Sequence, residues 1–346
     1  MKYYRLKNEI ETVTILYELD RLYQIVVEKN DEIPVGSIVH GRVKKIDKKA
    51  RLTFVDIGEK EDAFCAEKTG LKAGDDTFFN IRKTPDEEKF YTVDMDLKLE
   101  RNSSLLRIIP KKSGEFEMIF EKSSIGSSLK DEKRSGIETK ENSCDVKTNK
   151  NLFDKNLKYE RILLEKWKEI FSMKNTLPIP KIVYKAPTKS EKIIEEQNAE
   201  LSSDKDEVVV LLKNGKQNFE RRVDLEKGYL YVDTLPYMTI VDVNSGDYSE
   251  FFDSVLNRME VNKDAMKKLA EIIKLRNLEG VIIMDILKLP GKMNREFLEY
   301  LKSEYTEINF LDITRLGMLE MTIKKTGGEK ITAEKISSLI GTLENI

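Results

Sequence analysis

The last third of the chain alternates short apolar runs with stretches of helical periodicity, and this alternation limits the folds that are open to it. Residues 237–244 and 281–287 form strand-like runs, and a third run spans residues 308–313. Between these runs, apolar side chains recur every three to four residues, as on one face of a helix. Asn262 is expected to cap the first of these helices. The pattern predicts a βαβαβ unit with a parallel sheet and right-handed crossovers.

The rest of the chain predicts smaller folding units. Residues 36–66 contain short strand-like runs separated by glycines and charged turns, as in a small closed barrel. Residues 92–99 alternate between apolar and polar side chains, which predicts one half-buried strand. Residues 157–171 carry an apolar stripe at helical spacing. A length of 346 residues is expected to give two or three domains.

Composition excludes several kinds of chemistry. The chain has one histidine, His40, and two cysteines, Cys65 and Cys144. This set cannot build a four-ligand zinc site from cysteine and histidine, or a disulfide framework, and it disfavours a histidine-based catalytic triad. Catalysis should therefore rest on carboxylates and an oxygen-bound metal. Because 60 basic and 62 acidic residues give a net charge of −2, any binding of nucleic acid requires a local patch.

Hydropathy and the first residues bear on where the protein is expected to be located. No run of about 18 apolar residues is present, so no membrane span is expected. The first ten residues, MKYYRLKNEI, lack the apolar core of a secretory signal. The two cysteines are interpreted as free thiols. A cytoplasmic location is the expectation.

Two aspartates interrupt apolar strands: Asp242 lies in TIVDVNS and Asp285 in IIMDIL. A buried carboxylate requires a partner, a metal or a place at the mouth of the sheet. A βαβ crossover brings the two carboxyl ends together, where two carboxylates can hold one Mg²⁺. Asn244 shares a strand face with Asp242 and could orient it or donate to a substrate phosphate. Structural ion pairs or backbone capping would explain the two aspartates equally well.

The barrel segment carries a second candidate site. Residues 41–51 include six basic side chains, which suit a phosphate backbone but also an ordinary solvated turn. Strand parity points the small apolar side chains inward and places Phe54 and Phe64 on the more polar side. Aromatic rings there can stack unpaired bases. The alternative is that both rings cover a seam against another domain.

Five segments in combination resemble the bacterial RNase E/G family of single-strand endoribonucleases, over residues 16–325. They are GSIVHGRV (36–43), FVDIG (54–58), MTIVDVNS (238–245), LRNLEGVIIMD (275–285) and TRLGMLEM (314–321).

The resemblance implies an α+β multidomain fold, in which an S1 (OB-type) β-barrel is inserted in an RNase H-like subdomain and a DNase I-like α/β catalytic subdomain follows. The implied boundaries are 1–35 plus 180–222 for the RNase H-like subdomain, 36–100 for the S1 RNA-binding domain, 101–179 for a degenerate 5′-sensor-like insert, 223–325 for the catalytic subdomain and 326–346 for a tail.

The resemblance also implies a Mg²⁺-dependent endoribonuclease that leaves 5′-phosphate and 3′-hydroxyl ends, with Mn²⁺ as a substitute metal. Asp242 and Asp285 match the metal ligands of the family, and Asn244 matches the asparagine that supports the first of them. All three are therefore expected to be catalytic.

Further residues are implied in binding single-stranded RNA. Phe54 and Phe64 match aromatic residues of the S1 domain, and Lys89 matches a lysine that grips the strand. Lys147 and Thr148 match the pair that binds a 5′-monophosphate. Lysine replaces the arginine of that pair, and a point charge cannot make its bidentate contact.

Other departures put activity and assembly in question. Ser103 and Arg107 replace a glycine and an apolar contact of the sensor, and Lys288 replaces a carboxylate. Residues 243–257 contain three acids and no basic residue, which repels a phosphate backbone. The C-terminal Cys-x-x-Cys zinc link is absent, so no structural zinc is expected, and the chain should be a monomer or a homodimer without zinc.

Two alternatives to the endoribonuclease remain open. One is a weak or inactive family member that binds RNA as a scaffold or regulator, which the acidic segment favours. The intact Asp242, Asn244 and Asp285 oppose it. The other is a nuclease directed at DNA.

Overall fold

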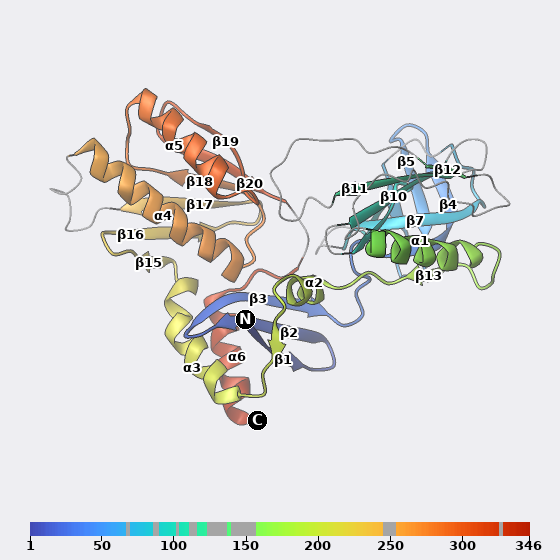
Figure 1. Cartoon of the computed structure of the whole chain (residues 1–346), viewed down its shortest axis with the longest axis horizontal. Coiled ribbons are helices and arrows are strands. Elements are labelled where there is room, and N and C mark those ends of the chain that lie inside the picture. The colour runs from blue at the N-terminus through green and yellow to red at the C-terminus, as the bar shows by residue number, and fades with distance from the viewer. Residues whose placement is uncertain are drawn as a thin grey trace. The chain divides into compact units, whose positions relative to one another are not determined.

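The computed structural model describes residues 1–66, 70–85, 90–101, 104–110, 116–122, 137–139, 157–244, 254–324 and 328–346. The chain divides into two compact units. One consists of Met1–Asn30 together with Lys189–Ile346, and the other of Asp31–Thr188. Each unit contains two hydrophobic cores of its own (Figure 1). Among the described helices, none is long and apolar enough to cross a membrane.

A closed five-stranded barrel forms the first part of the Asp31–Thr188 unit, as expected for an S1 or OB-like domain. Its strand order is β4-β5-β6-β8-β7, and β7 pairs back onto β4, which also pairs with β13 at its margin. Gly41 sits where strands approach closely, since a Cβ there would lie 2.9 Å from the Asp56 carbonyl oxygen. The strands are β4 (Ile38–Asp47), β5 (Leu52–Asp56), β6 (Ala63–Cys65), β7 (Asp76–Lys83), β8 (Thr92–Asp94) and β13 (Lys181–Tyr184).

A second sheet in this unit packs against a helix. The predicted helix is confirmed as α1 (Leu157–Ser172), and its Trp167 and Ile170 are buried against this sheet. The single strand expected at 92–99 was wrong, because the chain leaves the barrel after Asp94 and enters the second sheet at Leu97. That sheet has the order β12-β11-β10-β9, with β9 (Leu97–Arg101), β10 (Ser104–Pro110), β11 (Phe116–Lys122) and β12 (Ile137–Thr139).

The other unit begins with a small sheet covered by helices. Ile336, Leu339 and Leu343 of α6 are buried with side chains of β2, β3 and α3, so the segment expected to be a tail forms part of this core. The sheet has the order β14-β1-β2-β3, with β1 (Lys2–Lys7), β2 (Glu11–Glu18), β3 (Arg21–Lys29) and β14 (Glu200–Leu201). The helices are α2 (Lys189–Glu196), α3 (Lys205–Gly215), the 3₁₀ turn η1 (Lys216–Phe219) and α6 (Ala333–Asn345).

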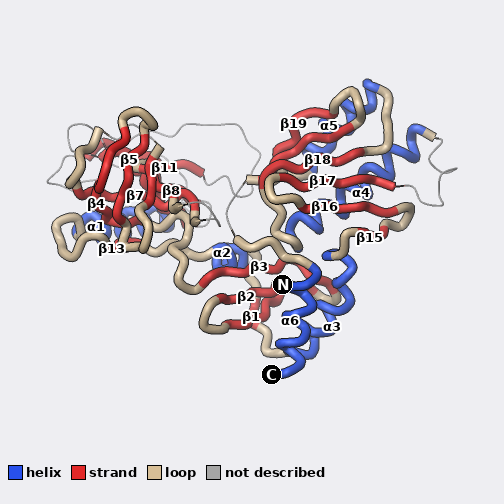
Figure 2. The backbone as a smooth tube through the Cα atoms, turned by 180° about the vertical axis from the view of Figure 1, so that it is seen from behind, coloured by secondary structure: helices blue, strands red, loops and turns tan. Residues whose placement is uncertain are grey.

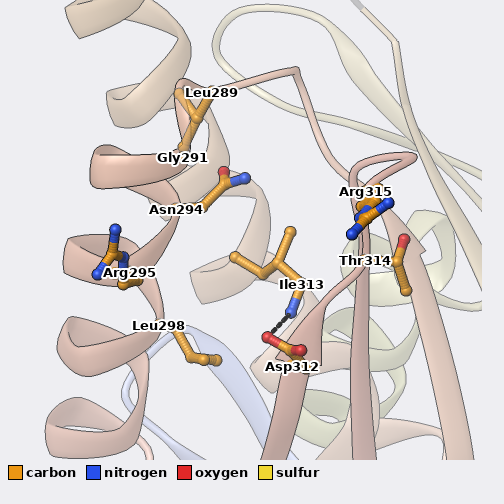
Figure 3. Close-up of a pocket in the computed structure, with 9 residues that line it drawn as sticks. All are labelled: Leu289, Gly291, Asn294, Arg295, Leu298, Asp312, Ile313, Thr314 and Arg315. Atoms are coloured by element: carbon orange, nitrogen blue, oxygen red, sulfur yellow. Dashed lines mark hydrogen bonds between the residues drawn. The ribbon is translucent and has the colours of Figure 1, made fainter.

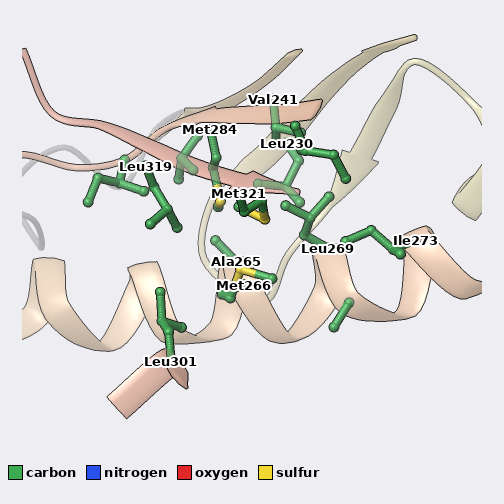
Figure 4. Close-up of a cluster of buried hydrophobic side chains, with 14 of the residues drawn as sticks. Leu230, Val241, Ala265, Met266, Leu269, Ile273, Met284, Leu301, Leu319 and Met321 are labelled. Atoms are coloured by element: carbon green, nitrogen blue, oxygen red, sulfur yellow. The ribbon is translucent and has the colours of Figure 1, made fainter. Parts of the chain in front are cut away.

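A six-stranded sheet with two helices on one face completes this unit, with strand order β15-β16-β17-β18-β20-β19 (Figure 2). Val241, Met284 and Leu319 of the sheet pack against Met266 and Leu269 of α4 (Figure 4). The elements are β15 (Arg222–Asp224), β16 (Tyr229–Thr234), β17 (Met238–Asn244), α4 (Val255–Leu275), β18 (Gly280–Asp285), α5 (Gly291–Glu304), β19 (Asn309–Ile313) and β20 (Met318–Ile323).

The expected βαβαβ order is confirmed, but the sheet is mixed and not wholly parallel. Strands β17 and β18 are parallel neighbours across α4. In the second half, β19 also runs in the direction of β18, but the two strands are not neighbours, because β20 lies between them and pairs antiparallel with both. The chain reverses at Gly317, whose φ is 95°, and this turn returns β20 along β19.

Candidate active site

The two aspartates of the sheet lie side by side. Asp242 of β17 is the register partner of Asp285, the last residue of β18. Because side chains alternate along a strand and Val241, Val243 and Met284 are buried toward the helices, both carboxylates lie on the opposite face. We call this face of the sheet, which also carries Asn244, the carboxylate face. Neighbouring strands are about 4.8 Å apart, so the two carboxylates are within reach of one ligand.

The electrostatics of the pair favour a bound cation. Burial raises the pKa of Asp285, and the negative charge of Asp242 raises it further. The Nδ2 of Asn244 donates a 2.7 Å hydrogen bond to Oδ2 of Asp242 and so orients that carboxylate. A cation between the two anions would remove their repulsion.

The donor set fits a metal that needs few protein ligands. Among the described residues, no group of three or more His, Cys, Asp or Glu side chains is placed to hold a metal ion. Mg²⁺ is usually held by one or two carboxylates, keeps several waters and meets substrate phosphates. The Asp242–Asp285 pair matches that pattern.

Asn262 has a different place from the one expected. It was predicted to cap a helix, but α4 begins at Val255 after Ser254, so Asn262 is inside the helix. Its fully buried side chain accepts a 2.9 Å hydrogen bond from the Leu287 N–H and donates a 2.9 Å bond to the Leu287 carbonyl. Asn262 therefore fixes the chain two residues after Asp285.

Strand β16 places two tyrosines on the carboxylate face, which the sequence reasoning missed. Tyr231 is the register partner of Asp242, and Tyr229 is the partner of Asn244. Directly opposed residues of an antiparallel pair point to the same face. The alternation Tyr-Leu-Tyr-Val in β16 was the available signal, but only the register of β16 on β17 assigns the rings to the aspartates.

In the barrel, the expected inward and outward faces are confirmed. Val55 and Ala63 are fully buried in the barrel core. Phe54 and Phe64 are register partners of each other, and both are half-buried on the opposite side of their strands. The structure therefore brings the two predicted aromatic residues together.

Other predicted residues fall outside the described part of the chain. These are Lys89, Lys147 and Thr148, together with Ser103 and the acids of the 245–253 segment. Arg107 is described, and its Nε lies 2.6 Å from Oδ1 of Asp96. This ion pair balances the charge of the Arg107 guanidinium.

A separate pocket of about 370 Å³ lies between the start of α5 and the end of β19. Asn294 projects into it from α5, and Arg315 lies across from it (Figure 3). Ile313, which also lines the pocket, packs against the core on the helix-covered face. The pocket and the carboxylate pair are therefore on different faces of the sheet.

Comparison with known proteins is consistent with this arrangement. A family model described as "Ribonuclease E/G family" matches residues 207–326, which contain both aspartates. Ribonuclease E of Synechocystis sp. is 30% identical over 118 residues, which are 32% of this chain and 18% of that protein. Ribonuclease G of Escherichia coli is 31% identical over 116 residues, which are 31% of this chain and 23% of that protein.

A Ribonuclease E/G-like protein of Porphyra purpurea is 29% identical over 105 residues, which are 29% of this chain and 20% of that protein. The matched stretch thus spans less than a quarter of the length of these relatives. Within the chain, the similarity to the ribonuclease E/G family lies in residues 207–326.

Proposed function

We propose that this protein is a Mg²⁺-dependent endoribonuclease that cleaves single-stranded RNA. The observation that carries the proposal is the register pairing of Asp242 with Asp285 on a half-buried face, inside the segment that matches the ribonuclease E/G family. Within the described part of the chain, neither carboxylate forms an ion pair with a basic residue, and such a pair of carboxylates is costly in a merely structural role. They are well suited to a divalent cation.

In this proposal Asp242 and Asp285 hold the metal. When bound, Mg²⁺ lowers the pKa of a coordinated water and offsets charge on the phosphate. Asn244 keeps Asp242 in one orientation through its 2.7 Å hydrogen bond. Asn262 holds the backbone at Leu287 and so limits movement of the adjacent Asp285.

The proposed reaction is hydrolysis of a phosphodiester. A bond forms between a water oxygen and phosphorus, and the bond from phosphorus to the 3′ oxygen breaks. The 3′ oxygen takes up a proton. One fragment therefore keeps a 5′-phosphate, and the other ends in a 3′-hydroxyl.

The barrel supplies the RNA-holding surface in this proposal. Phe54 and Phe64 form an adjacent aromatic pair, on which unpaired bases can stack. Lys89, Lys147 and Thr148 enter the proposal through the family resemblance alone. Their roles are strand contact for Lys89 and 5′-end contact for the other two.

The test is a gel assay with a 5′-labelled, A/U-rich single-stranded RNA. Asp242→Asn and Asp285→Asn should each slow cleavage at least about a hundredfold, because they remove metal ligands worth several kcal/mol in the transition state. RNA binding should stay within about twofold, since the barrel is unchanged. Asp264→Asn, an exposed carboxylate on α4, is the matched control and should cut normally.

Normal cleavage by both variants would show that the site is wrongly assigned. A second candidate function is an RNA-binding scaffold that does not cut, favoured by three acids and no basic residue at 243–257. Tight RNA binding by wild-type protein without any cleavage would support the scaffold. Faster cleavage of a matched DNA oligonucleotide would point to a DNA-directed nuclease.

A further inference from the structure

The carboxylate face continues from the aspartates onto β16 as an aromatic surface. Tyr231 lies one strand from Asp242, a separation of about 4.8 Å between strand axes. The rings of Tyr229 and Tyr231 are 5.2 Å apart between centroids and meet edge to face at 73°. The edge-to-face contact fixes each ring against the other.

Two arginines of the adjoining segment lie over these rings. The Cζ of Arg222 is 4.0 Å from the centroid of Tyr229, and the Cζ of Arg221 is 5.0 Å from that of Tyr231. We call Tyr229, Tyr231, Arg221 and Arg222 the tyrosine platform. The four side chains together form one surface of aromatic rings and guanidinium groups.

The charges of both arginines are already balanced by carboxylates. Arg221 makes a two-pronged contact with Asp233, at 2.6 and 2.9 Å, and Arg222 Nε lies 3.0 Å from Asp224. These contacts hold the guanidinium planes in place, although the arginine side chains remain 69% and 56% exposed. A paired guanidinium is a poor phosphate ligand, but its exposed plane can still stack against a base.

We propose that the tyrosine platform stacks an unpaired nucleobase of the RNA, beside the phosphate that is cut at Asp242 and Asp285. This inference rests on the proposed function, because it places the platform next to that reaction. Stacking accepts any base, since every base has a π face. It requires that the base leave a duplex, so the platform selects for single strands at the cleavage position.

A stacking site and a phosphate site differ in their dependence on salt. Each phosphate contact adds about 0.7 to the slope of log affinity against log salt for a single strand. Loss of a stacking ring should weaken binding without changing that slope. Because both arginines are already paired with carboxylates, we expect loss of a tyrosine ring to weaken RNA binding by the same factor at every salt concentration.

The test uses the non-cleaving Asp285→Asn chain and a single-stranded RNA that carries 2-aminopurine at one position beside the cleavage site. Binding should quench 2-aminopurine fluorescence at the position next to the cut and not at positions several nucleotides away. Tyr231→Ala should remove this quenching and weaken binding about tenfold, with the salt slope unchanged. Tyr231→Phe should restore both, because the ring alone stacks.

Tyr237, which is 79% exposed in the turn before β17, provides the matched control, and Tyr237→Ala should behave like the parent. Quenching that survives in Tyr231→Ala, or a reduced salt slope, would overturn the platform. If the wild-type protein cleaves RNA and Tyr231→Ala changes neither the quenching nor the affinity, the platform is refuted and the nuclease remains supported. If the wild-type protein never cuts, quenching at any labelled position that Tyr231→Ala removes would support the platform and refute the nuclease.

Discussion

Single side chains set the chemistry on the carboxylate face. Asp242 receives a hydrogen bond from Asn244, whereas Asp285 has a raised pKa because of its burial and the neighbouring charge. The two carboxylates are therefore not equivalent, although they are register partners. A cation bound near Asp285 would oppose the rise of its pKa.

His40, the only histidine of the chain, is expected to make the stability of the fold depend on pH. His40 is 1% exposed, and its Nδ1 has no hydrogen-bond partner in the described part of the chain. Burial lowers the pKa of His40 below 6.5, and the nearby Lys181 lowers it further. The unfolded chain therefore takes up a proton that the folded chain resists, so stability is full above about pH 6.5 and falls as the pH drops below it.

This prediction can be followed through the single tryptophan. The ring centroid of Trp167 lies 6.1 Å from that of Phe78, and the Phe78 centroid lies 5.0 Å from that of His40. The fluorescence of Trp167 therefore reports on the core around His40. The urea midpoint should be lower at about pH 5.5 than at about pH 7.5. His40→Phe should remove most of the difference. An unchanged difference in that variant would assign the acid sensitivity to other groups.

At the scale of secondary structure, α4 and the end of β18 are joined by one side chain. Asn262→Ala removes both hydrogen bonds to Leu287 and leaves two part-buried backbone groups without this partner. We expect a loss of about 1–3 kcal/mol in the free energy of unfolding. Cleavage should also fall in protein that is still folded, because the chain after Asp285 is released. Urea titration and the RNA gel assay measure the two effects.

Asn309→Ala is the matched control for the contact of Asn262 with Leu287. Asn309 is an exposed strand residue whose side chain donates one hydrogen bond to Thr322. The substitution should change stability by less than about 0.5 kcal/mol. Asn262→Asp keeps the acceptor for the Leu287 N–H but loses the donor, so it should fall between Asn262→Ala and wild type. Equal stability of the two Asn262 variants and wild type would show that the hydrogen bonds from Asn262 to Leu287 do not stabilise the fold.

The strand–helix–strand order around α4 could be predicted from sequence, because hydrophobic periodicity distinguishes a buried strand from an amphipathic helix. It placed Asp242 and Asp285 on neighbouring strands, as observed. The insertion of β20 between β18 and β19 could not be predicted, because local periodicity does not specify which strands pair. The place of Tyr231 beside Asp242 could not be predicted for the same reason, because it depends on the register of β16 on β17.

At the scale of the whole molecule, residues distant in sequence complete each core. Val13 and Ile25 share a core with Ile336 and Leu343, which was not evident from the sequence. Buried Arg276 donates 2.6 Å hydrogen bonds to the carbonyls of Asn218 and Glu220 and links the end of α4 to the segment before β15. Burial lowers the pKa of Arg276 to about 10. The six-stranded sheet is thus tied to its neighbouring core.

Cleavage of RNA with a divalent metal can be tested on the whole wild-type chain. A 5′-labelled single-stranded RNA is incubated with the protein in Mg²⁺ and in EDTA. We expect discrete fragments with 3′-hydroxyl ends in Mg²⁺ and intact RNA in EDTA. Equal cleavage in both reactions, or bound but intact RNA in both, would contradict this expectation.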